Sequence, residues 1–388
     1  MIAGATGPDE ATAAHQRDLP GLDGIRAIAV CLVISCHSPN DFASGTPLRR
    51  IADHGQFGVP IFFVLSGYLI TYLLLREEAR VGRIGLGRFY MRRVIRIIPP
   101  MYALVAVSVV FAWLGWITLT PLALAGELLF FANLVPVPMV TGHLWSLAIE
   151  EQFYLAWPLV FLACRNPRWR AWVVGSALAL MPLWRWLTMW RVGTSEIYLP
   201  IRDAILTGCL LALATKLPSW ERCLGSRAMR HSATSCVAVA ALVGTFTPTY
   251  AAIPKIGVVS SLLQSLCVAI VINQVVRAPG GWLTRGLSLA PIAWIGRLSY
   301  SLYLWHTLFC AAVWPEVESR FLHLPWSLAP TLATAMLSYY VIEKPLFRLR
   351  ARFRPVRPQP GPIVPSPLRP PAIQPSGEAS TEVGRDRG

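Results

Sequence analysis

The chain has 388 residues, of which 54% are hydrophobic and only 14% are charged. An ordinary soluble domain carries roughly 25% charged residues, so this composition excludes one. Lys and Arg number 35 against 20 Asp and Glu, which gives a net charge of +15. A nucleic-acid partner is not expected, because the arginines stand in short clusters between apolar runs, as membrane topology requires.

Long apolar runs predict an all-α protein, a polytopic membrane bundle of about ten transmembrane helices that has the lipid bilayer as its partner. The expected spans are 22–37, 57–75, 98–116, 146–163, 171–190, 199–215, 234–253, 257–276, 290–313 and 326–345. An eleventh run, 122–135, is shorter than the roughly 20 residues that a bilayer requires.

The loop charges orient this bundle. With ten spans and both termini cytoplasmic, the cytoplasmic loops carry 24 Lys and Arg and the outer loops carry 5. A full crossing by 122–135 would move every later loop to the other side and remove this bias. We therefore expect 122–135 to be a re-entrant or interfacial segment on the outer side.

Composition divides the chain into three parts. Residues 1–19 form a polar cytoplasmic segment, and residues 20–350 form the membrane domain. Residues 351–388 are rich in Pro and Arg and cannot bury a core, so a disordered cytoplasmic tail is expected.

Charged side chains inside apolar spans are informative, because each costs at least about 2.5–3.5 kcal/mol on insertion scales. The first span, GLDGIRAIAVCLVISCH, holds Asp23, Arg26 and His37. Arg26 and His37 are 11 positions apart, so they share one helix face and are separated by roughly 16 Å along the axis. Such a face suits a site that crosses the membrane. The alternative is that Arg26 snorkels to the headgroups and His37 only caps the helix.

A second cluster, LGRFYMRRVIRIIPP, covers 86–100. The pattern predicts a basic amphipathic helix at the cytoplasmic interface, which Pro99 and Pro100 separate from the next span. Arg88, Arg92 and Arg96 stand at i, i+4 and i+8 with Arg93 beside them, and their guanidiniums suit the phosphates of a nucleotide-like donor. Lipid headgroup binding together with membrane topology explains the same spacing.

A third cluster, HLWSLAIEEQFYLAWPL, covers 143–159 and holds His143, Glu150 and Glu151. The adjacent carboxylates point about 100° apart, so at most one faces a given partner. They suit the orientation of a histidine, a bond to sugar hydroxyls or a structural ion pair. No Walker A, GxGxxG, HExxH or CxxC pattern is present, and no metal site is expected.

The blocks together are more specific than each alone. Their combination resembles the acyltransferase 3 family of bacterial integral membrane acyltransferases, which acylate O-antigen, exopolysaccharide, peptidoglycan and macrolides. The matching blocks, in the family's order, are GLDGIRAIAVCLVISCH, FFVLSGYLI, RFYMRRVIRIIPP, HLWSLAIEEQFYL, IGRLSYSLYLWH and IEKPLFRL. They extend from about 20 to 350, and Lys344 is a departure where the family commonly has Arg.

The resemblance implies roles for individual residues. The family's signature of a basic residue, ten residues and His falls on Arg26 and His37, and its Arg-x-x-Arg falls on Arg93 and Arg96. His37 is expected to be the catalytic base or acyl relay, with Glu150 or Glu151 orienting it, and the three arginines are expected to hold the donor. The residues expected to bind the substrate or to support the site are Asp23, Ser66, Gly67, Tyr68, His143, Tyr300, His306 and Glu343.

The resemblance also implies the reaction: an O-acyltransferase of the bacterial inner membrane. The donor would be acyl-CoA, most often acetyl-CoA, acting as a co-substrate rather than a permanently bound cofactor. The acceptor would be a hydroxyl of a surface glycan, a glycolipid or a secreted small molecule. A transporter or flippase is the alternative, in which the intramembrane charges line a substrate path.

Overall fold

The computed structural model describes residues 21–192, 202–245, 257–310, 313–314, 316–351 and 353. Over these ranges the regular elements are all helical and no strand is present, which confirms the expected all-α class. The polar segment 1–19 and most of the tail 351–388 lie outside the described residues, so both remain predictions.

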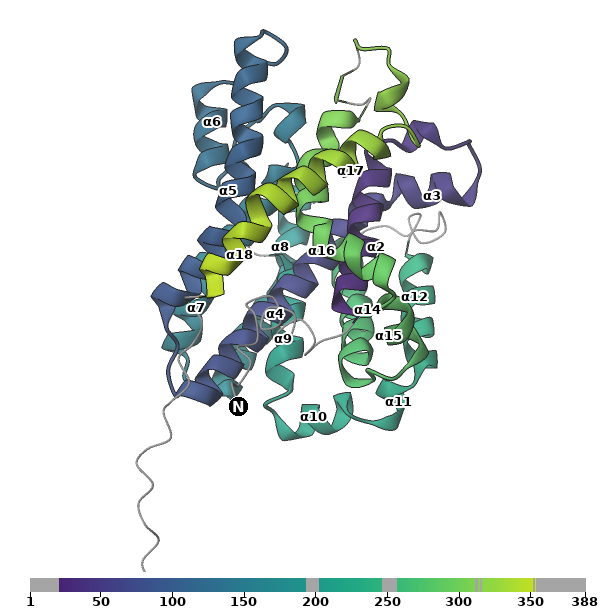
Figure 1. Ribbon diagram of the computed structural model, residues 1–388. Coiled ribbons are helices and arrows are strands. Elements are labelled where there is room, and N and C mark those ends of the chain that lie inside the picture. Colours follow the sequence, from purple (N-terminus) through teal and green to yellow (C-terminus); the bar gives the residue numbers. More distant parts are fainter. Residues whose placement is uncertain are drawn as a thin grey trace, which may run out of the picture. The chain divides into compact units, whose positions relative to one another are not determined.

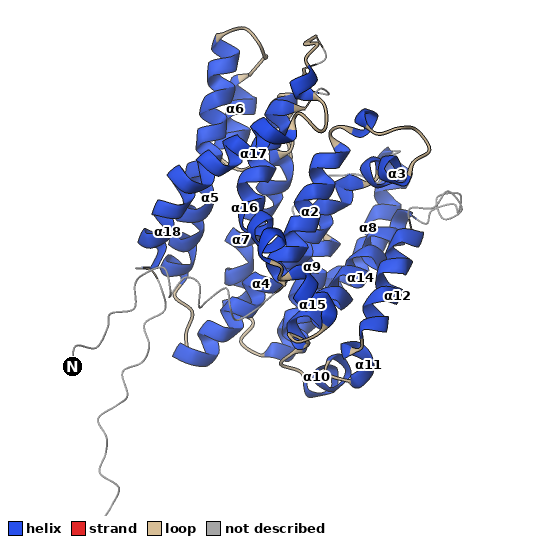
Figure 2. Cartoon of the chain, turned by 45° about the vertical axis from the view of Figure 1, so that its right-hand side comes forward, coloured by secondary structure: helices blue, strands red, loops and turns tan. Residues whose placement is uncertain are grey.

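Figures 1 and 2 show the helices and their labels. The longer ones are α2 (Leu22–Cys36), α4 (Gly58–Val81), α5 (Leu86–Trp113), α7 (Leu144–Ala163), α8 (Pro167–Val192), α9 (Asp203–Ala214), α12 (Ser232–Gly244), α14 (Gly257–Arg277), α16 (Ala290–Trp305) and α17 (Leu328–Leu337). The shorter ones are α3 (Pro47–Asp53), α6 (Pro121–Leu128), α10 (Pro218–Leu224), α11 (Arg227–Arg230), α15 (Trp282–Leu287) and α18 (Lys344–Ala351).

Three helices among the described residues are long and apolar enough to cross a membrane: Gly55–Val81, Leu86–Trp113 and Ser260–Arg277. Asp203–Ala214 and Ala233–Gly244 are apolar but shorter. The larger number of about ten spans stays a prediction, as do the positions of both termini. Parts of three expected spans, 199–201, 246–253 and 311–312, lie outside the described residues.

The expected break at the double proline is wrong. Helix α5 runs without interruption from Leu86 to Trp113, with Pro99 and Pro100 inside it. The basic segment and the next span are therefore one helix. A membrane helix tolerates proline where a neighbouring helix supplies partners for the nearby backbone. The prolines remove the donors to the carbonyls of Ile95 and Arg96, four positions earlier, and next to these the Tyr300 hydroxyl on α16 donates to the carbonyl of Ile97 at 2.7 Å.

The apolar run 122–135 does not form a helical crossing. Helix α6 ends at Leu128, and its 8 residues extend only about 12 Å, well short of the roughly 30 Å hydrocarbon core. Turn and loop residues follow it. The Tyr102 hydroxyl on α5 donates to the Leu128 carbonyl at 3.0 Å, which fastens α6 beside α5. Whether the segment is re-entrant or interfacial stays a prediction.

The last two expected spans differ from the structure at their ends. Helix α16 ends at Trp305 rather than near 313, and a 3-10 turn, His306–Phe309, follows it. In this turn a side chain bonds to a backbone carbonyl: the Cys310 thiol donates to the His306 carbonyl at 3.1 Å. Helix α17 continues through a π-helical segment, Ser338–Glu343, directly into α18.

Small residues bring the central helices into backbone contact. A Cβ at Gly67 on α4 would lie 2.0 Å from the Ile205 carbonyl oxygen on α9, and one at Gly208 would lie 2.1 Å from that of Val64. A Cβ at Gly296 on α16 would lie 1.8 Å from the carbonyl oxygen of Asp23 on α2. Small residues allow this approach between membrane helices. The contact of α2 with α16 places the ends of both helices side by side.

Candidate functional site

Three histidines meet where three helices end or begin, and we call them the histidine cluster: His37, His143 and His306. His37 follows α2, His143 precedes α7 and His306 follows α16. The ring centroids of His37 and His306 are 4.7 Å apart, and those of His143 and His306 are 5.3 Å apart. In the described part of the chain, no group of three or more His, Cys, Asp or Glu is arranged to hold a metal ion.

The hydrogen bonds of His37 assign its proton to one ring nitrogen. Its Nδ1 lies 2.8 Å from the carbonyl oxygen of Val33, one turn earlier on α2. A carbonyl can only accept, so Nδ1 carries the proton and the neutral ring keeps its lone pair on Nε2. His37 is partly exposed, whereas the exposed fractions of His143 and His306 are 5% and 0%. The Nε2 of His37 is therefore the basic nitrogen of this cluster that a substrate can approach.

Hydroxyl groups that the sequence analysis did not select hold the cluster in place. The Tyr303 hydroxyl donates to the His143 carbonyl at 2.9 Å and lies 2.5 Å from the Ser146 hydroxyl. The Thr307 hydroxyl donates to the Val140 carbonyl at 2.8 Å. A signal for two of them was present: Tyr303 and Ser146 stand three positions from His306 and His143, on the same helix faces.

A second group, the arginine cluster, contains Arg26, Arg93 and Arg96. Arg26 pairs with Asp23 at 2.7 Å on α2. The guanidinium of Arg93 on α5 lies over the Tyr154 ring, with 5.1 Å between Cζ and the ring centroid. Arg96, one turn further along α5, is within electrostatic range of both Arg26 and Arg93. Helices α2 and α5 thus bring the three predicted donor-binding arginines together.

Two members of the arginine cluster lack a carboxylate partner. Within the described ranges, neither Arg93 nor Arg96 makes an ion pair, and both are partly exposed. Four other arginines do have such partners: Arg92 with Glu77, Arg170 with Glu78, Arg185 with Asp203 and Arg277 with Glu221. Guanidiniums bind phosphate and carboxylate groups in bidentate fashion. Arg93 and Arg96 therefore retain the capacity to bind an anion.

Glu150 and Glu151 lie on α7 between the two clusters. Glu150 is seven residues beyond His143, a rise of about 10 Å along the helix. Its carboxylate accepts from the hydroxyls of Ser66 and Tyr154. The carboxylate of Glu151 is within electrostatic range of Arg93 and Arg96, and its Oε1 is buried without a hydrogen-bond partner.

Neither glutamate orients His37 through a direct bond in the described part of the chain. The Val33 carbonyl takes that position on the His37 ring instead. A catalytic role for Glu150 or Glu151 therefore stays a hypothesis. Their place between the clusters suits contact with a donor or acceptor better than contact with the imidazole.

Comparison with known proteins identifies the chain's family. A model of an acyltransferase domain, that of the acyltransferase 3 family, matches residues 19–342. The chain belongs to this acyltransferase family. Membership confirms the resemblance on which the assignment of Arg26, His37, Arg93 and Arg96 depends, although the comparison tests none of those residues individually.

The relatives of this chain include proteins named as O-acetyltransferases. Peptidoglycan O-acetyltransferase OatA of Listeria monocytogenes is 30% identical over 363 residues, which are 84% of this chain and 56% of that protein. O-acetyltransferase OatA of Staphylococcus aureus is 30% identical over 370 residues, 85% of this chain and 57% of that one. YrhL of Bacillus subtilis is 32% identical over 367 residues, 86% of this chain and 55% of YrhL.

The chain spans about half the length of these curated relatives. No solved structure matches it. Residues 19–342 therefore form an acyltransferase domain of this family, and its long apolar helices suit a membrane setting.

The remaining predicted site residues of the chain belong to neither cluster and lie at several separate positions. Ser66 reaches Glu150, whereas Gly67 packs on α9 as described above. Tyr68 is buried and stacks on Tyr72 with 6.0 Å between ring centroids, on another face of α4. Glu343, at the end of the π-helical segment, accepts from the Ser301 hydroxyl and is within electrostatic range of Arg96.

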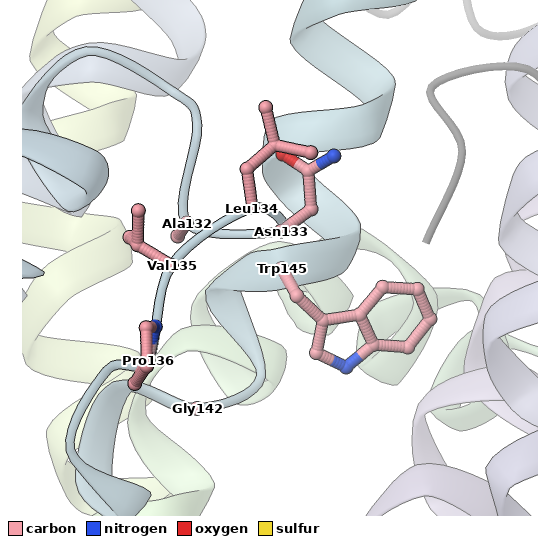
Figure 3. Close-up of a pocket in the computed structure, with 7 residues that line it drawn as sticks. All are labelled: Ala132, Asn133, Leu134, Val135, Pro136, Gly142 and Trp145. Atoms are coloured by element: carbon pink, nitrogen blue, oxygen red, sulfur yellow. The ribbon is translucent and has the colours of Figure 1, made fainter. Parts of the chain in front are cut away.

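One cavity of the protein, of about 350 Å³, opens beside the turn before α7 (Figure 3). The residues around it are Ala132, Asn133, Leu134, Val135, Pro136, Gly142 and Trp145. None of the predicted site residues lines this cavity, so it is separate from the two clusters.

Proposed function

We propose that this protein transfers an acyl group, in the simplest case acetyl, from acyl-CoA to a hydroxyl of a cell-surface glycan. The single observation that carries the proposal is that one protein holds both an anion-binding pair of arginines and a basic histidine nitrogen. Among the described residues Arg93 and Arg96 are guanidiniums without carboxylate partners, and His37, after the other end of α2 from Arg26, presents a basic nitrogen roughly 16 Å away along the helix. A glycan acceptor is favoured because a relative is named as a peptidoglycan O-acetyltransferase.

The donor is the molecule that needs cations. Coenzyme A carries phosphates, which Arg93 and Arg96 bind by charge-assisted hydrogen bonds, with Arg26 as the third cation. These arginines belong to the end of the bundle that the loop charges place in the cytoplasm, where acyl-CoA is available. The long pantetheine arm then extends along α2 toward His37, over the roughly 16 Å that separate Arg26 from His37.

The chemistry takes place at His37. As the acceptor oxygen attacks the thioester carbonyl, Nε2 of His37 removes the hydroxyl proton. The carbon–sulfur bond breaks, and the proton passes from His37 to the departing thiolate, so that an ester and free coenzyme A result. General base catalysis of this kind contributes about 10²–10⁴-fold. In the covalent form of the mechanism, Nε2 itself attacks the thioester and later passes the acyl group to the hydroxyl.

This function places the protein in the bacterial inner membrane as a multi-pass enzyme with both termini cytoplasmic and residues 20–350 as the membrane domain. Glycolipids and secreted small molecules with a hydroxyl group are further acceptors of the same chemistry. The flippase alternative is not favoured by the relatives described above, since two of them are named as O-acetyltransferases.

The test is transfer by the purified full chain in proteoliposomes. Labelled acetyl-CoA is supplied with peptidoglycan fragments, and the products are read by mass spectrometry for an added acetyl group. Acetylated glycan that requires both the protein and acetyl-CoA supports the proposal. Transport of the unmodified glycan without any donor, and no acetylated product, would overturn it in favour of a flippase.

A further inference from the structure

His306 has no established task in the reaction, yet it is completely buried and touches the predicted base. It sits in the 3-10 turn after α16, and its exposed fraction is 0%. Its Nε2 lies 3.3 Å from Nδ1 of His37, and the two rings meet edge to face at 77°. A buried imidazole needs partners for both nitrogens. The question is which nitrogen donates and which accepts.

The backbone around His306 answers this question. Its Nδ1 lies 2.8 Å from the Tyr303 carbonyl oxygen, which can only accept, so the proton of the neutral ring is on Nδ1. Nε2 of His306 is then an acceptor and is directed at the Nδ1–H of His37. That N–H already points to the Val33 carbonyl. His37 therefore has one donor shared between two acceptors, and the pattern is consistent at every atom.

The geometry points to His306 as a positioning residue for the acyl transfer, which rests on the function proposed above. Its Nε2 lone pair, together with the Val33 carbonyl, keeps the His37 proton on Nδ1 and the basic lone pair on Nε2. When His37 gains a second proton at Nε2 from the acceptor hydroxyl, the same lone pair stabilises the imidazolium. His306 touches no substrate in this scheme.

The other rings and thiols near His37 do not duplicate this contact. Cys36 lies on the same helix, with its thiol 3.4 Å from Nδ1 of His37, but that thiol donates to the Val33 carbonyl. The His143 ring faces His306 rather than bonding to His37. Among the described side chains, His306 supplies the nitrogen acceptor for the His37 N–H.

Two amide substitutions separate positioning from packing. The glutamine amide occupies the place of a histidine Nε2, so His306→Gln keeps an acceptor toward His37 and loses the donor to Tyr303. The asparagine amide occupies the place of Nδ1, so His306→Asn keeps the bond to the Tyr303 carbonyl and loses the acceptor. The measurement is kcat and KM for acetyl-CoA in proteoliposomes, with thermal unfolding of each variant in parallel.

We expect His306→Gln to lose less than about tenfold in kcat, because one charge-assisted hydrogen bond persists. His306→Asn should lose about ten- to a hundredfold, with KM for acetyl-CoA unchanged in both, because the donor is bound at the arginine cluster. Cys310→Ala is the matched control: it removes a thiol bond to the His306 carbonyl and leaves the ring, so kcat should change less than threefold.

The opposite order, with His306→Asn as active as the native protein and His306→Gln impaired, would overturn the positioning role and leave a purely structural histidine. A kcat loss in both variants that parallels a loss of thermal stability would have the same meaning. Failure of the proposed function itself has a different signature: the native protein would acetylate no acceptor, or His37→Gln would transfer at the native rate.

Discussion

The histidine cluster and the arginine cluster differ in how far their polar groups are already bonded within the protein. The histidine cluster consists of imidazole rings whose contacts are largely completed by carbonyls and hydroxyls, and two of its three members are fully or nearly fully buried. The arginine cluster consists of cations, of which Arg93 and Arg96 have no carboxylate partner in the described part of the chain and are partly exposed. The histidine cluster is therefore preorganised, whereas the arginine cluster retains the capacity to bind an anion.

This difference separates the two tasks of a transferase. A base needs a fixed orientation and a defined tautomer, which a dense hydrogen-bond network supplies. A binding site for a charged donor needs unsatisfied charge in a place that the donor can enter. Changes in the histidine cluster should therefore act on kcat, and changes in the arginine cluster on KM for the donor.

The largest expected effect comes from His37→Ala. The variant loses the nitrogen that takes the proton, so kcat should fall by about 10²–10⁴-fold while KM for acetyl-CoA stays within about threefold. Membrane insertion and thermal stability should be preserved, because the His37 ring is partly exposed. An undiminished kcat would show that His37 takes no part in the chemistry and that the histidine cluster is not the catalytic one of the two clusters.

The next effect is at the arginine cluster. Replacing both Arg93 and Arg96 with Ala should raise KM for acetyl-CoA about a hundredfold or more, since each of the two lost hydrogen bonds to a charged group contributes about 1.5–3 kcal/mol. The kcat at saturating donor should change little. An unchanged KM would return these residues to lipid headgroup binding.

Arg92 is the control within the same turn of α5. It donates to Glu77 at 3.2 Å and to the Phe353 carbonyl at 2.7 Å, so it is already engaged. Arg92→Ala leaves the buried Glu77 carboxylate without its cation, which costs up to about 3–5 kcal/mol of stability. Thermal unfolding of this variant should therefore move to lower temperature, while KM for acetyl-CoA should not rise as it does in the double variant.

The smallest expected effect is on KM for acetyl-CoA and comes from substitutions of Tyr154, beside the arginine cluster. Its ring supports Arg93, whereas its hydroxyl bonds to Glu150. Tyr154→Phe keeps the ring, so KM for acetyl-CoA should change less than about twofold. Tyr154→Leu removes a cation–π contact of about 0.5–1 kcal/mol and should raise KM about two- to fivefold. Equal KM values in the two variants would show that the ring does not position Arg93.

The sequence did not predict the continuous helix across Pro99 and Pro100. Local chemistry predicts a break there, because proline lacks a donor and clashes with the preceding turn. The observed α5 continues, with the Tyr300 hydroxyl bonded to a carbonyl beside the prolines. That partner lies about two hundred positions away on another helix, and no local pattern reveals it.

By itself, the sequence determined the helical class, the family and the shared face of Arg26 and His37. Apolar composition, block order and the 100° rotation per residue are all properties of a single stretch of chain. Only the tertiary structure decided that His143 and His306 join His37, and that Val33 rather than a glutamate orients the His37 ring. It also decided that, among the described residues, Arg93 and Arg96 have no carboxylate partner where Arg92 has one. These outcomes depend on which helix ends meet, and that is set by backbone contacts at small residues such as Gly296 rather than by the spacing of the polar residues themselves.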